Sequence, residues 1–274
     1  MKVAAIQMVS GTSAERNLHA AHALLAQAAQ AGAELAVLPE YFCLMGQHDS
    51  DKLALQEPLG RGPLQDWLAA SAREFGLWLV GGTLPLALDG AAAPDRCRNA
   101  SLAFAPSGER VALYDKIHLF RFNDGSRSYD EAATLVPGQR PVLFELPSRD
   151  GHRWRVGMSV CYDLRFPELY RAYAAQGADL LLVPSAFTHV TGPAHWEVLL
   201  RARAIENLSA VIAAAQGGKH ENGRRTWGQS MVIDPWGHIL AERAEGAGVV
   251  LAELDPAAPA LRRQQLPALA HRVL

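Results

Sequence analysis

The sequence has few cysteines: Cys43, Cys97 and Cys161 are the only three among 274 residues. Three cysteines are too few, and odd in number, for a disulfide framework, and they fit a reducing compartment best. Long apolar runs are also absent, because the most apolar later stretch, residues 77–93, is broken by Gly81, Gly82 and Pro85. The N-terminal apolar run is short and is interrupted by Gln7, which makes a poor signal peptide. We therefore expect a cytoplasmic protein with no membrane-spanning segment and no membrane partner.

The charges are nearly balanced, and the usual metal and nucleotide motifs are missing. The 26 Lys and Arg residues stand against 28 Asp and Glu residues. The sequence thus lacks the basic stripe that tracks phosphates, and nucleic acid is not an expected partner. The histidines include no H-x-x-x-H pair and no C-x-x-C occurs, so a zinc site lacks its usual spacing. No G-x-G-x-x-G or P-loop motif follows a predicted strand. We expect no metal and no cofactor.

Strand-like and helix-like segments alternate along the chain. Apolar residues make up 49% of it, enough for a sizeable core without a disulfide or metal. Residues 2–8 predict a buried strand, residues 14–30 carry apolar side chains at helical spacing, and residues 35–38 predict a second strand. This order favours parallel strands joined by a right-handed crossover. Residues 155–183 predict a second unit of the same kind.

The remaining segments predict further helices and strands in one domain. Helices are expected near residues 63–75 and 193–208, and strands near 77–83, 99–105, 109–115, 209–215, 228–234, 237–242 and 247–253. Residues 234–237 (DPWG) predict a hairpin turn. No low-complexity linker or charge block divides the chain. We therefore predict a single domain over residues 1–274, with residues 256–274 as a C-terminal extension.

Two segments of similar sequence lie 145 positions apart (177 − 32). Residues 32–39 (GAELAVLP) and 177–184 (GADLLLVP) each contain a helix stop, an apolar strand and a proline. They are either two quasi-equivalent strands whose ends open at one edge of the core, or the ordinary form of a helix-to-strand junction. In both cases ligands of open α/β sheets bind at the carboxyl ends of the strands, where Glu40 and Ser185 lie.

Cys161 has the setting of a nucleophile. It follows the apolar residues 155–160 and precedes a helix that Pro167 can begin, so its side chain is presented outward beside backbone N–H groups. Positive neighbours and a helix N-terminus both favour the reactive thiolate. The alternative is a buried structural cysteine. That is the assignment of Cys43 and Cys97, because neither has a strand–turn–helix setting.

A carboxylate and a cation also follow predicted strands. Glu40 ends the apolar run of residues 35–39, and Lys116 ends residues 110–115. A carboxylate at the end of a buried strand must pair, cap or react, because burying an unpaired charge is unfavourable. Each residue alone also fits an exposed loop charge. Together the three strand ends supply a base, a cation and a thiol.

A Cys–His protease is the competing catalytic assignment. Its base would be His118, His189 or His195. The residues around Cys161 lack the C-G-S-C-W type of signature of such proteases, which counts against this assignment.

Three motifs around these residues occur in a specific order: residues 38–40 (LPE), 114–119 (YDKIHL) and 161–168 (CYDLRFPE). In these motifs, and nearly end to end, the sequence resembles the nitrilase superfamily of carbon–nitrogen hydrolases. The resemblance implies an α/β fold, a four-layer αββα sandwich of two stacked sheets. It also implies that the chain pairs through its helices with a second subunit, as a homodimer or a higher homo-oligomer.

The resemblance also implies roles for individual residues. Glu40 would be the general base, Lys116 the cation beside the oxyanion, and Cys161 the nucleophile that forms an acyl-thioester. A further glutamate of the family lies in a loop between the lysine and the cysteine, and Glu131 occupies the matching place. The neighbouring loop, residues 121–130, differs from that of animal members, so a solvated loop carboxylate is the alternative for Glu131.

Four residues are candidates for binding the substrate. Arg165 offers a guanidinium that can clamp a substrate carboxylate at two points, and the alternative is an ion pair with Glu168. The backbone N–H of Tyr162 is a candidate donor to the oxyanion. Phe187 and Thr188 are candidates by their position at the end of the second of the two similar segments.

Later motifs narrow the substrate. Residues 184–187 (PSAF), 191–197 (TGPAHWE), 200–206 (LRARAIE) and 213–216 (AAAQ) resemble the amidase branch of the superfamily. Within that branch they imply a small carboxylate-bearing amide as substrate, deaminated glutathione, hydrolysed to 2-oxoglutarate and Cys-Gly. The alternatives are 2-oxoglutaramate, the ω-amidase substrate, and a non-catalytic binding member of the superfamily. The occupied Glu, Lys and Cys positions argue against the last.

Glu197 has two interpretations. Its spacing from Arg201 predicts an i,i+4 ion pair on a helix surface. The family resemblance instead allows it a place near Lys116.

Overall fold

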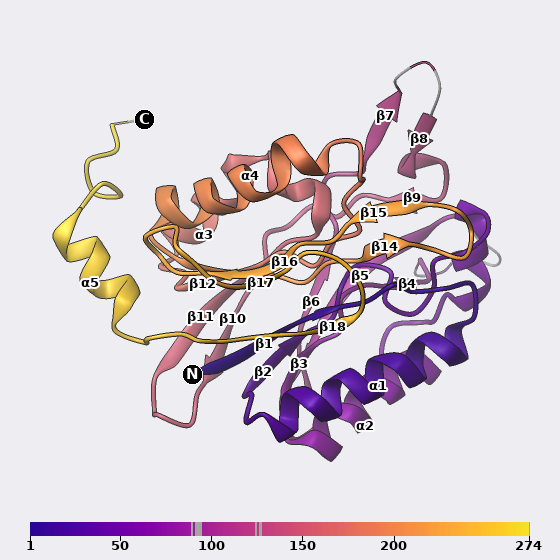
Figure 1. Cartoon of the computed structure of the whole chain (residues 1–274), viewed down its shortest axis with the longest axis horizontal. Helices are drawn as coiled ribbons and strands as arrows, with labels where there is room; N and C mark the ends of the chain where they lie inside the picture. The colour runs from indigo at the N-terminus through magenta and orange to yellow at the C-terminus, as the bar shows by residue number, and fades with distance from the viewer. Residues whose placement is uncertain (89, 91–94, 124, 126–127, 274) are drawn as a thin grey trace.

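Two β-sheets stack face to face, and a pair of helices covers the outer face of each (Figure 1). This computed structural model describes residues 1–88, 90, 95–123, 125 and 128–273. The helices are α1 (Ala14–Gln30) and α2 (Pro63–Phe75) on the first sheet, and α3 (Pro167–Ala175) and α4 (Gly192–Asn207) on the second. The order of layers is the αββα sandwich that the sequence predicts, and the α/β fold class is confirmed.

The first sheet has eight strands, in the order β18–β1–β2–β3–β5–β4 with β6 and β9 paired to β5. Its strands are β1 (Lys2–Gln7), β2 (Leu35–Val37), β3 (Trp78–Val80), β4 (Leu84–Leu86), β5 (Cys97–Phe104), β6 (Arg110–Asp115), β9 (Leu135–Val136) and β18 (Gly248–Glu253). Strands β1, β2 and β3 run parallel. The predicted first βαβ unit is therefore β1–α1–β2.

The second sheet has six strands, in the order β10–β11–β12–β13–β16–β17. They are β10 (Leu143–Pro147), β11 (Arg153–Met158), β12 (Leu180–Leu182), β13 (Ala210–Ala213), β16 (Ser230–Ile233) and β17 (Ile239–Arg243). Strands β11 and β12 are parallel and flank α3, which confirms the second predicted unit. The predicted turn at residues 234–237 joins β16 to β17, with the Gly237 N–H donating to the Asp234 carbonyl at 3.0 Å.

Alternate residues of β1 face different layers. Val3 and Ala5 pack in the core that includes both sheets, whereas Ala4 and Ile6 pack in the core beneath α1 and α2. Because both faces of the strand are covered, it has no polar side. This explains the continuous apolar run in its sequence.

Several shorter elements were not predicted. Two hairpins stand outside the main sheets, β7 (Arg121–Asn123) with β8 (Ser128–Asp130), and β14 (Gly217–Lys219) with β15 (Arg225–Trp227). Short 3₁₀ segments are η1 (Asp49–Leu55), η2 (Glu131–Ala133) and η3 (Cys161–Arg165). The predicted C-terminal extension contains α5 (Ala258–Gln265), whose Arg263 bonds to Asp179 at 3.2 Å. Residue 274 of that extension lies outside the described residues.

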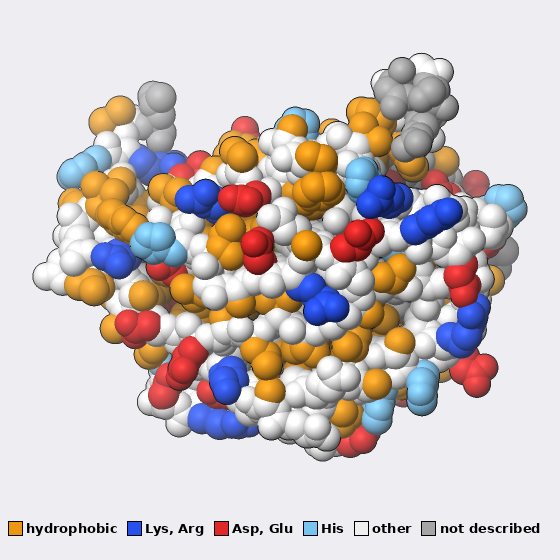
Figure 2. Space-filling model, viewed as in Figure 1, with side chains coloured by type: hydrophobic (Ala, Val, Ile, Leu, Met, Phe, Trp, Pro, Cys, Tyr) orange, Lys and Arg blue, Asp and Glu red, His pale blue; other side chains and the backbone are white. Residues whose placement is uncertain are grey.

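The surface carries both signs of charge. Figure 2 shows Lys, Arg, Asp and Glu side chains interspersed over the face in view. Among the described residues, no helix is long and apolar enough to cross a membrane. In the same part of the chain, no group of three or more His, Cys, Asp or Glu side chains is placed to hold a metal ion.

Candidate active site

Glu40, Lys116 and Cys161 meet where three strands end. Glu40 follows β2 and Lys116 follows β6, both in the first sheet, whereas Cys161 follows β11 in the second. The Lys116 Nζ donates to Glu40 Oε1 at 2.9 Å, and Cys161 lines the same pocket as Glu40. The structure thus brings together three residues that lie far apart in the sequence.

The Lys116 ammonium is fully buried and is held by two carboxylates. Besides Glu40, it donates to both oxygens of Glu131, at 2.9 and 2.7 Å. Burial alone would lower the pKa of Lys116, but the charges of Glu131 and Glu40 outweigh it and hold that pKa above its usual value. The lysine is therefore a fixed positive charge at neutral pH.

The second oxygen of Glu40 links the two sheets. Glu40 Oε2 accepts the backbone N–H of Ala186 at 2.9 Å, and Oε1 also accepts from Asn99 Nδ2 at 3.0 Å. Glu40 follows β2 and Ala186 follows β12, and these are the strands of the two similar segments in the sequence. Their ends therefore do open at one place, as the first of the two sequence interpretations proposes.

Cys161 lies in a constrained turn at the start of η3. Its φ is +50°, a left-handed conformation that non-glycine residues adopt at a cost of about 1–3 kcal/mol. Its N–H donates to the Pro184 carbonyl at 3.0 Å, which ties the turn to the end of β12. Burial raises the pKa of the thiol, and the charge of Glu40 raises it further, while Lys116 opposes both. The resting thiol therefore keeps its proton until a base removes it.

Asp163 braces this turn against the lysine segment. One of its oxygens accepts the Val160 N–H at 2.8 Å and the Tyr114 hydroxyl at 2.6 Å. The other accepts the His118 N–H at 3.0 Å and lies 2.7 Å from His118 Nδ1. Residues 114 and 118 flank Lys116, so one buried carboxylate fixes the cysteine turn relative to the lysine.

Glu131 is part of this cluster. Besides the two bonds from Lys116, it accepts the Phe120 N–H at 2.7 Å and the Tyr41 hydroxyl at 3.0 Å. Burial would raise the pKa of its carboxyl, but the Lys116 charge and these hydrogen bonds outweigh burial and lower it. With a side chain only 14% exposed, Glu131 is not a solvated loop carboxylate.

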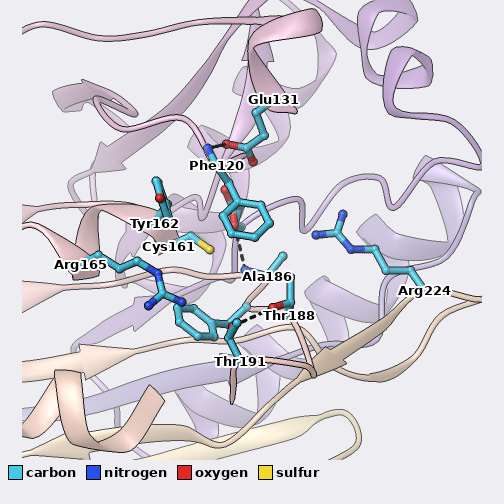
Figure 3. A pocket seen from close by; sticks show the side chains of 11 residues that line it. Phe120, Glu131, Cys161, Tyr162, Arg165, Ala186, Thr188, Thr191 and Arg224 are labelled. Atoms are coloured by element: carbon cyan, nitrogen blue, oxygen red, sulfur yellow. Dashed lines mark hydrogen bonds between the residues drawn. The ribbon is translucent and has the colours of Figure 1, made fainter. Parts of the chain in front are cut away.

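A pocket of about 300 Å³ opens above Cys161 (Figure 3). Its lining includes three of the four residues that the resemblance singles out for catalysis and all four candidates for substrate binding, and the fourth catalytic candidate, Lys116, bonds to two lining carboxylates. The lining residues are Glu40, Phe120, Glu131, Cys161, Tyr162, Arg165, Ala186, Phe187, Thr188, Thr191 and Arg224.

Residues 2–263 match the model of the family described as carbon-nitrogen hydrolase. The chain belongs to the carbon–nitrogen hydrolase family. The resemblance read from the three sequence motifs is thereby confirmed, and so is the enzyme class.

Curated relatives match this carbon–nitrogen hydrolase over nearly its whole length. Deaminated glutathione amidase of Synechocystis sp. is 42% identical over 273 residues, covering 98% of this chain and 97% of that protein. Omega-amidase of Xenopus tropicalis is 34% identical over 268 residues, covering 97% and 92%. Each of the two substrates suggested by the sequence is therefore matched by the name of a curated relative.

Solved structures agree with the fold. The C. elegans NitFhit protein superposes with a TM-score of 0.87 at 35% identity, and this hydrolase spans 99% of its own length but only 65% of that longer chain. A glutamate-to-glutamine mutant of the amidase from Nesterenkonia sp. AN1, solved with the acetamide moiety of fluoroacetamide covalently added at its active site cysteine, has a TM-score of 0.78 at 28% identity. That comparison covers 100% of this chain and 94% of the other.

Some alternative contacts expected from the sequence do not occur in this hydrolase. Arg165 lies 3.2 Å from His195 Nδ1 rather than pairing with Glu168. Glu197 does not bond to the lysine: it pairs with Arg201 at 3.3 Å, as its helical spacing predicts, and accepts from Gln229. The position allowed to it near Lys116 is therefore wrong, because α4 directs this half-exposed side chain away from the buried cluster.

The histidines considered as bases serve other contacts. His118 bonds to Asp163 and stacks on Phe166 with ring centroids 3.6 Å apart. His195 contacts Arg165, and His189 packs edge-on against Trp227. None of the three lines the Cys161 pocket, whose carboxylate Glu40 is the nearer base. The Cys–His alternative has no support in these contacts.

Four lining residues were missed by the sequence reasoning: Phe120, Ala186, Thr191 and Arg224. Phe120 directly follows the motif at residues 114–119 and Ala186 lies within the motif at residues 184–187, so their place in the sequence was an available signal. Thr191 bonds through its hydroxyl to Thr188 at 2.8 Å, a contact that no pattern predicts. Arg224 comes from the unpredicted β14–β15 hairpin and carried no signal of its own.

Proposed function

We propose that this chain is an amidase that hydrolyses deaminated glutathione to 2-oxoglutarate and cysteinylglycine. One observation carries the proposal: a thiol, a carboxylate and a buried ammonium converge in a pocket that also presents a guanidinium, Arg165, with no carboxylate partner among the described residues. The acyl part of deaminated glutathione is a 2-oxo acid with a free carboxylate, which such a guanidinium binds well. The name of the 42% identical Synechocystis relative supports this choice.

In the proposed mechanism, Glu40 removes the proton from the Cys161 thiol as the sulfur attacks the amide carbon. A base is needed because burial and the Glu40 charge hold the pKa of the thiol well above its usual value. The developing oxyanion is stabilised by the Lys116 ammonium and by the backbone N–H of Tyr162. No acceptor for that N–H is found within the described part of the chain, which leaves it available to a ligand.

The protonated Glu40 then donates its proton to the departing amine, the carbon–nitrogen bond breaks, and an acyl-thioester on Cys161 remains. Water enters, Glu40 takes its proton, and the resulting hydroxide attacks the thioester carbon. The thiolate leaves as the carboxylic acid product forms and recovers its proton from Glu40. One carboxylate thus serves as base and acid in turn.

Glu131 is proposed to position Lys116. Glu131→Gln keeps the shape of the side chain but removes one of the two carboxylate charges that neutralise the Lys116 ammonium. We expect the free energy of unfolding at neutral pH to fall by about 1–3 kcal/mol, and kcat to fall roughly tenfold with a smaller change in KM. Urea unfolding and steady-state kinetics measure these two effects.

The effect on stability has a defined pH dependence. Because Lys116 lowers the pKa of Glu131, the carboxylate stabilises the fold above its ordinary pKa of about 4.3, and this contribution is lost as the pH falls through the lowered value. The stability gap between wild type and Glu131→Gln should therefore shrink in acid. Glu145→Gln, at an exposed glutamate on β10, is the matched control. Unchanged kinetics in Glu131→Gln would contradict the positioning role.

ω-Amidase activity on 2-oxoglutaramate is the second candidate, favoured by the 34% identical Xenopus relative. The two activities share the acyl product and differ in the leaving group. An assay that detects 2-oxoglutarate, ammonia and cysteinylglycine separates them, and the proposal requires a higher kcat/KM for deaminated glutathione. Release of 2-oxoglutarate from 2-oxoglutaramate alone would overturn it.

A non-catalytic binding protein is the alternative that the carbon–nitrogen hydrolase family and the amidase relatives argue against. The chain retains Glu40, Lys116 and Cys161 in contact or in one pocket, which favours catalysis. Incubation with substrate followed by rapid acid quenching should reveal the acyl-enzyme as a mass increment on the peptide containing Cys161. Its absence together with absent turnover would favour the binding protein.

Further proposals concern the whole chain. We infer a single domain over residues 1–274, a cytoplasmic location, and a homodimer or higher homo-oligomer formed through the outer helices. Two exposed apolar side chains on α4, Val198 and Ile205, give such pairing apolar surface to bury. Sedimentation velocity measures the assembly state, and a monomer at micromolar concentration would contradict it.

A further inference from the structure

Two arginines enter the pocket from opposite sides. Figure 3 shows Arg165 on one side of Cys161 and Arg224 on the other. The pocket carboxylates Glu40 and Glu131 are both bonded to Lys116. Among the described residues, no carboxylate lies within salt-bridge distance of either guanidinium. Both positive charges therefore remain available to a ligand.

Arg224 is held in place by its backbone rather than by an ion pair. It precedes β15, and β15 pairs with the pocket segment through a bridge between Thr226 and Thr188. Its N–H donates to Asn222 Oδ1 at 2.9 Å, and Asn222 in turn donates to the Gly46 carbonyl at 2.6 Å. The turn that carries Arg224 is thus fixed at both ends.

The guanidinium of Arg224 has weak partners only. It lies 5.7 Å from the ring centroid of Tyr129, and its Nη1 is 3.8 Å from Met45 Sδ. Its buried Nε has no hydrogen-bond partner in the described structure. A guanidinium held so near a pocket with an unused donor is well suited to bind an anion.

The space beyond each arginine differs. Arg165 lies on the same short turn as Cys161 and borders the pocket of about 300 Å³ together with Phe187. Arg224 lines that pocket and also a second, more open hollow of about 1030 Å³, whose lining includes Lys52 and Asn222. An acyl group stays bound to the cysteine during the reaction, whereas a leaving group must depart. The enclosed side therefore suits the acyl group and the open side suits the leaving group.

We propose that Arg224 determines specificity by binding the carboxylate of the leaving group, so that the enzyme prefers amides with a carboxylate at each end. The inference rests on the proposed amidase function and adds the leaving-group side of the site. Deaminated glutathione has a 2-oxo acid carboxylate for Arg165 and a glycine carboxylate for Arg224. 2-Oxoglutaramate has only the first, because its leaving group is ammonia.

The test compares Arg224→Gln with wild type on both amides. We expect kcat/KM for deaminated glutathione to fall about 10–100-fold, mainly through KM, and this loss to exceed that for 2-oxoglutaramate by tenfold or more. Arg165→Gln should lower kcat/KM for both substrates by a similar factor, because both carry the acyl carboxylate. Arg225→Gln is the matched control, since the neighbouring Arg225 is exposed and pairs with Glu245.

A third substrate isolates the contact. In 2-oxoglutaryl-cysteinylglycinamide the terminal carboxylate is replaced by an amide. For the wild-type enzyme, this replacement should lower kcat/KM by about the same factor as Arg224→Gln does on deaminated glutathione. The Arg224→Gln variant should hydrolyse deaminated glutathione and its terminal amide with similar kcat/KM. Arg224→Lys should recover part of the loss and guards against a folding defect, which thermal melting also detects.

The outcomes separate two failures. Equal losses on all three substrates, or none, would contradict the role of Arg224 while leaving the amidase function standing. Absence of turnover by the wild-type enzyme on every amide would overturn the proposed function, and this inference with it.

Discussion

Cys161→Ala is expected to abolish amide hydrolysis while leaving the protein folded. The proposed mechanism passes through a thioester on this sulfur, and no other thiol lines the pocket in the described structure. A positioned acid–base group or one oxyanion donor contributes roughly 10²–10⁴ in rate. Loss of the nucleophile should exceed either, so we expect turnover to fall by about 10⁴-fold or more.

Stability should change much less than activity in this variant. The substitution removes one buried sulfur from a turn whose position is set by the bond from the Cys161 N–H to the Pro184 carbonyl and by the contacts of Asp163. Neither of these contacts uses the sulfur atom, so alanine at position 161 preserves them. We expect a change of about 1 kcal/mol in the free energy of unfolding. Circular dichroism and urea unfolding test this, and kinetics test turnover.

Cys43→Ala is the matched control for the loss of a buried thiol. Burial raises the pKa of the Cys43 thiol to about 12 and that of Cys97 to about 11, and unlike Cys161 neither thiol lines the pocket of the base Glu40. Cys43 lies in the core beneath α1 and α2. Its alanine variant should keep wild-type kinetics. Normal turnover in Cys161→Ala would contradict the thioester mechanism.

Glu40→Gln is the second change with a large expected effect. The amide keeps only one oxygen, so it can replace the bond from Lys116 to Oε1 or the bond from the Ala186 N–H to Oε2 but not both, and it cannot remove a proton from the thiol. We expect kcat/KM to fall roughly 10²–10⁴-fold. Acylation and deacylation should both slow, because one carboxylate serves both steps. Single-turnover kinetics with acid quenching separate the two.

The same variant distinguishes a lost base from a lost nucleophile. The charge of Glu40 is one cause of the raised pKa of the thiol, so its removal should not protect Cys161 from a small alkylating reagent. We expect a haloamide adduct on Cys161 in Glu40→Gln and none in Cys161→Ala, measured by intact mass. Glu57→Gln is the control: this buried carboxylate accepts the Leu64 N–H of α2, so its loss should lower stability and not turnover per folded molecule.

The sequence predicted those parts of the site that strand ends supply. Glu40, Lys116 and Cys161 each follow a strand, and apolar runs locate strands well. One of the two interpretations of the similar strand segments placed their ends at the same edge of the core, and the bond from the Ala186 N–H to Glu40 agrees with it. The three residues meet because the two stacked sheets bring the ends of β2, β6 and β11 to one place.

Residues on irregular segments were harder to predict. Glu131 required the family resemblance, because nothing local to its short turn indicates that it reaches Lys116. Arg224 depends on the pairing of β15 with residues near Thr188, a contact between distant segments. For Glu197 the predicted pair with Arg201 was right and the position near Lys116 was wrong, since helical spacing fixes the partner of a side chain but not the direction in which the whole helix faces.

The catalytic candidates come from two sheets, and this determines what happens if the chain is cut into two fragments. Glu40, Lys116 and Glu131 all precede β10, and Cys161 follows it, so the base and cation belong to one half of the chain and the nucleophile to the other. A break between β9 and β10 would yield two fragments, each chemically incomplete. Only their reassociation, with Asp163 of one fragment bonded to Tyr114 of the other, would rebuild the centre. Amide hydrolysis would then report fragment complementation directly.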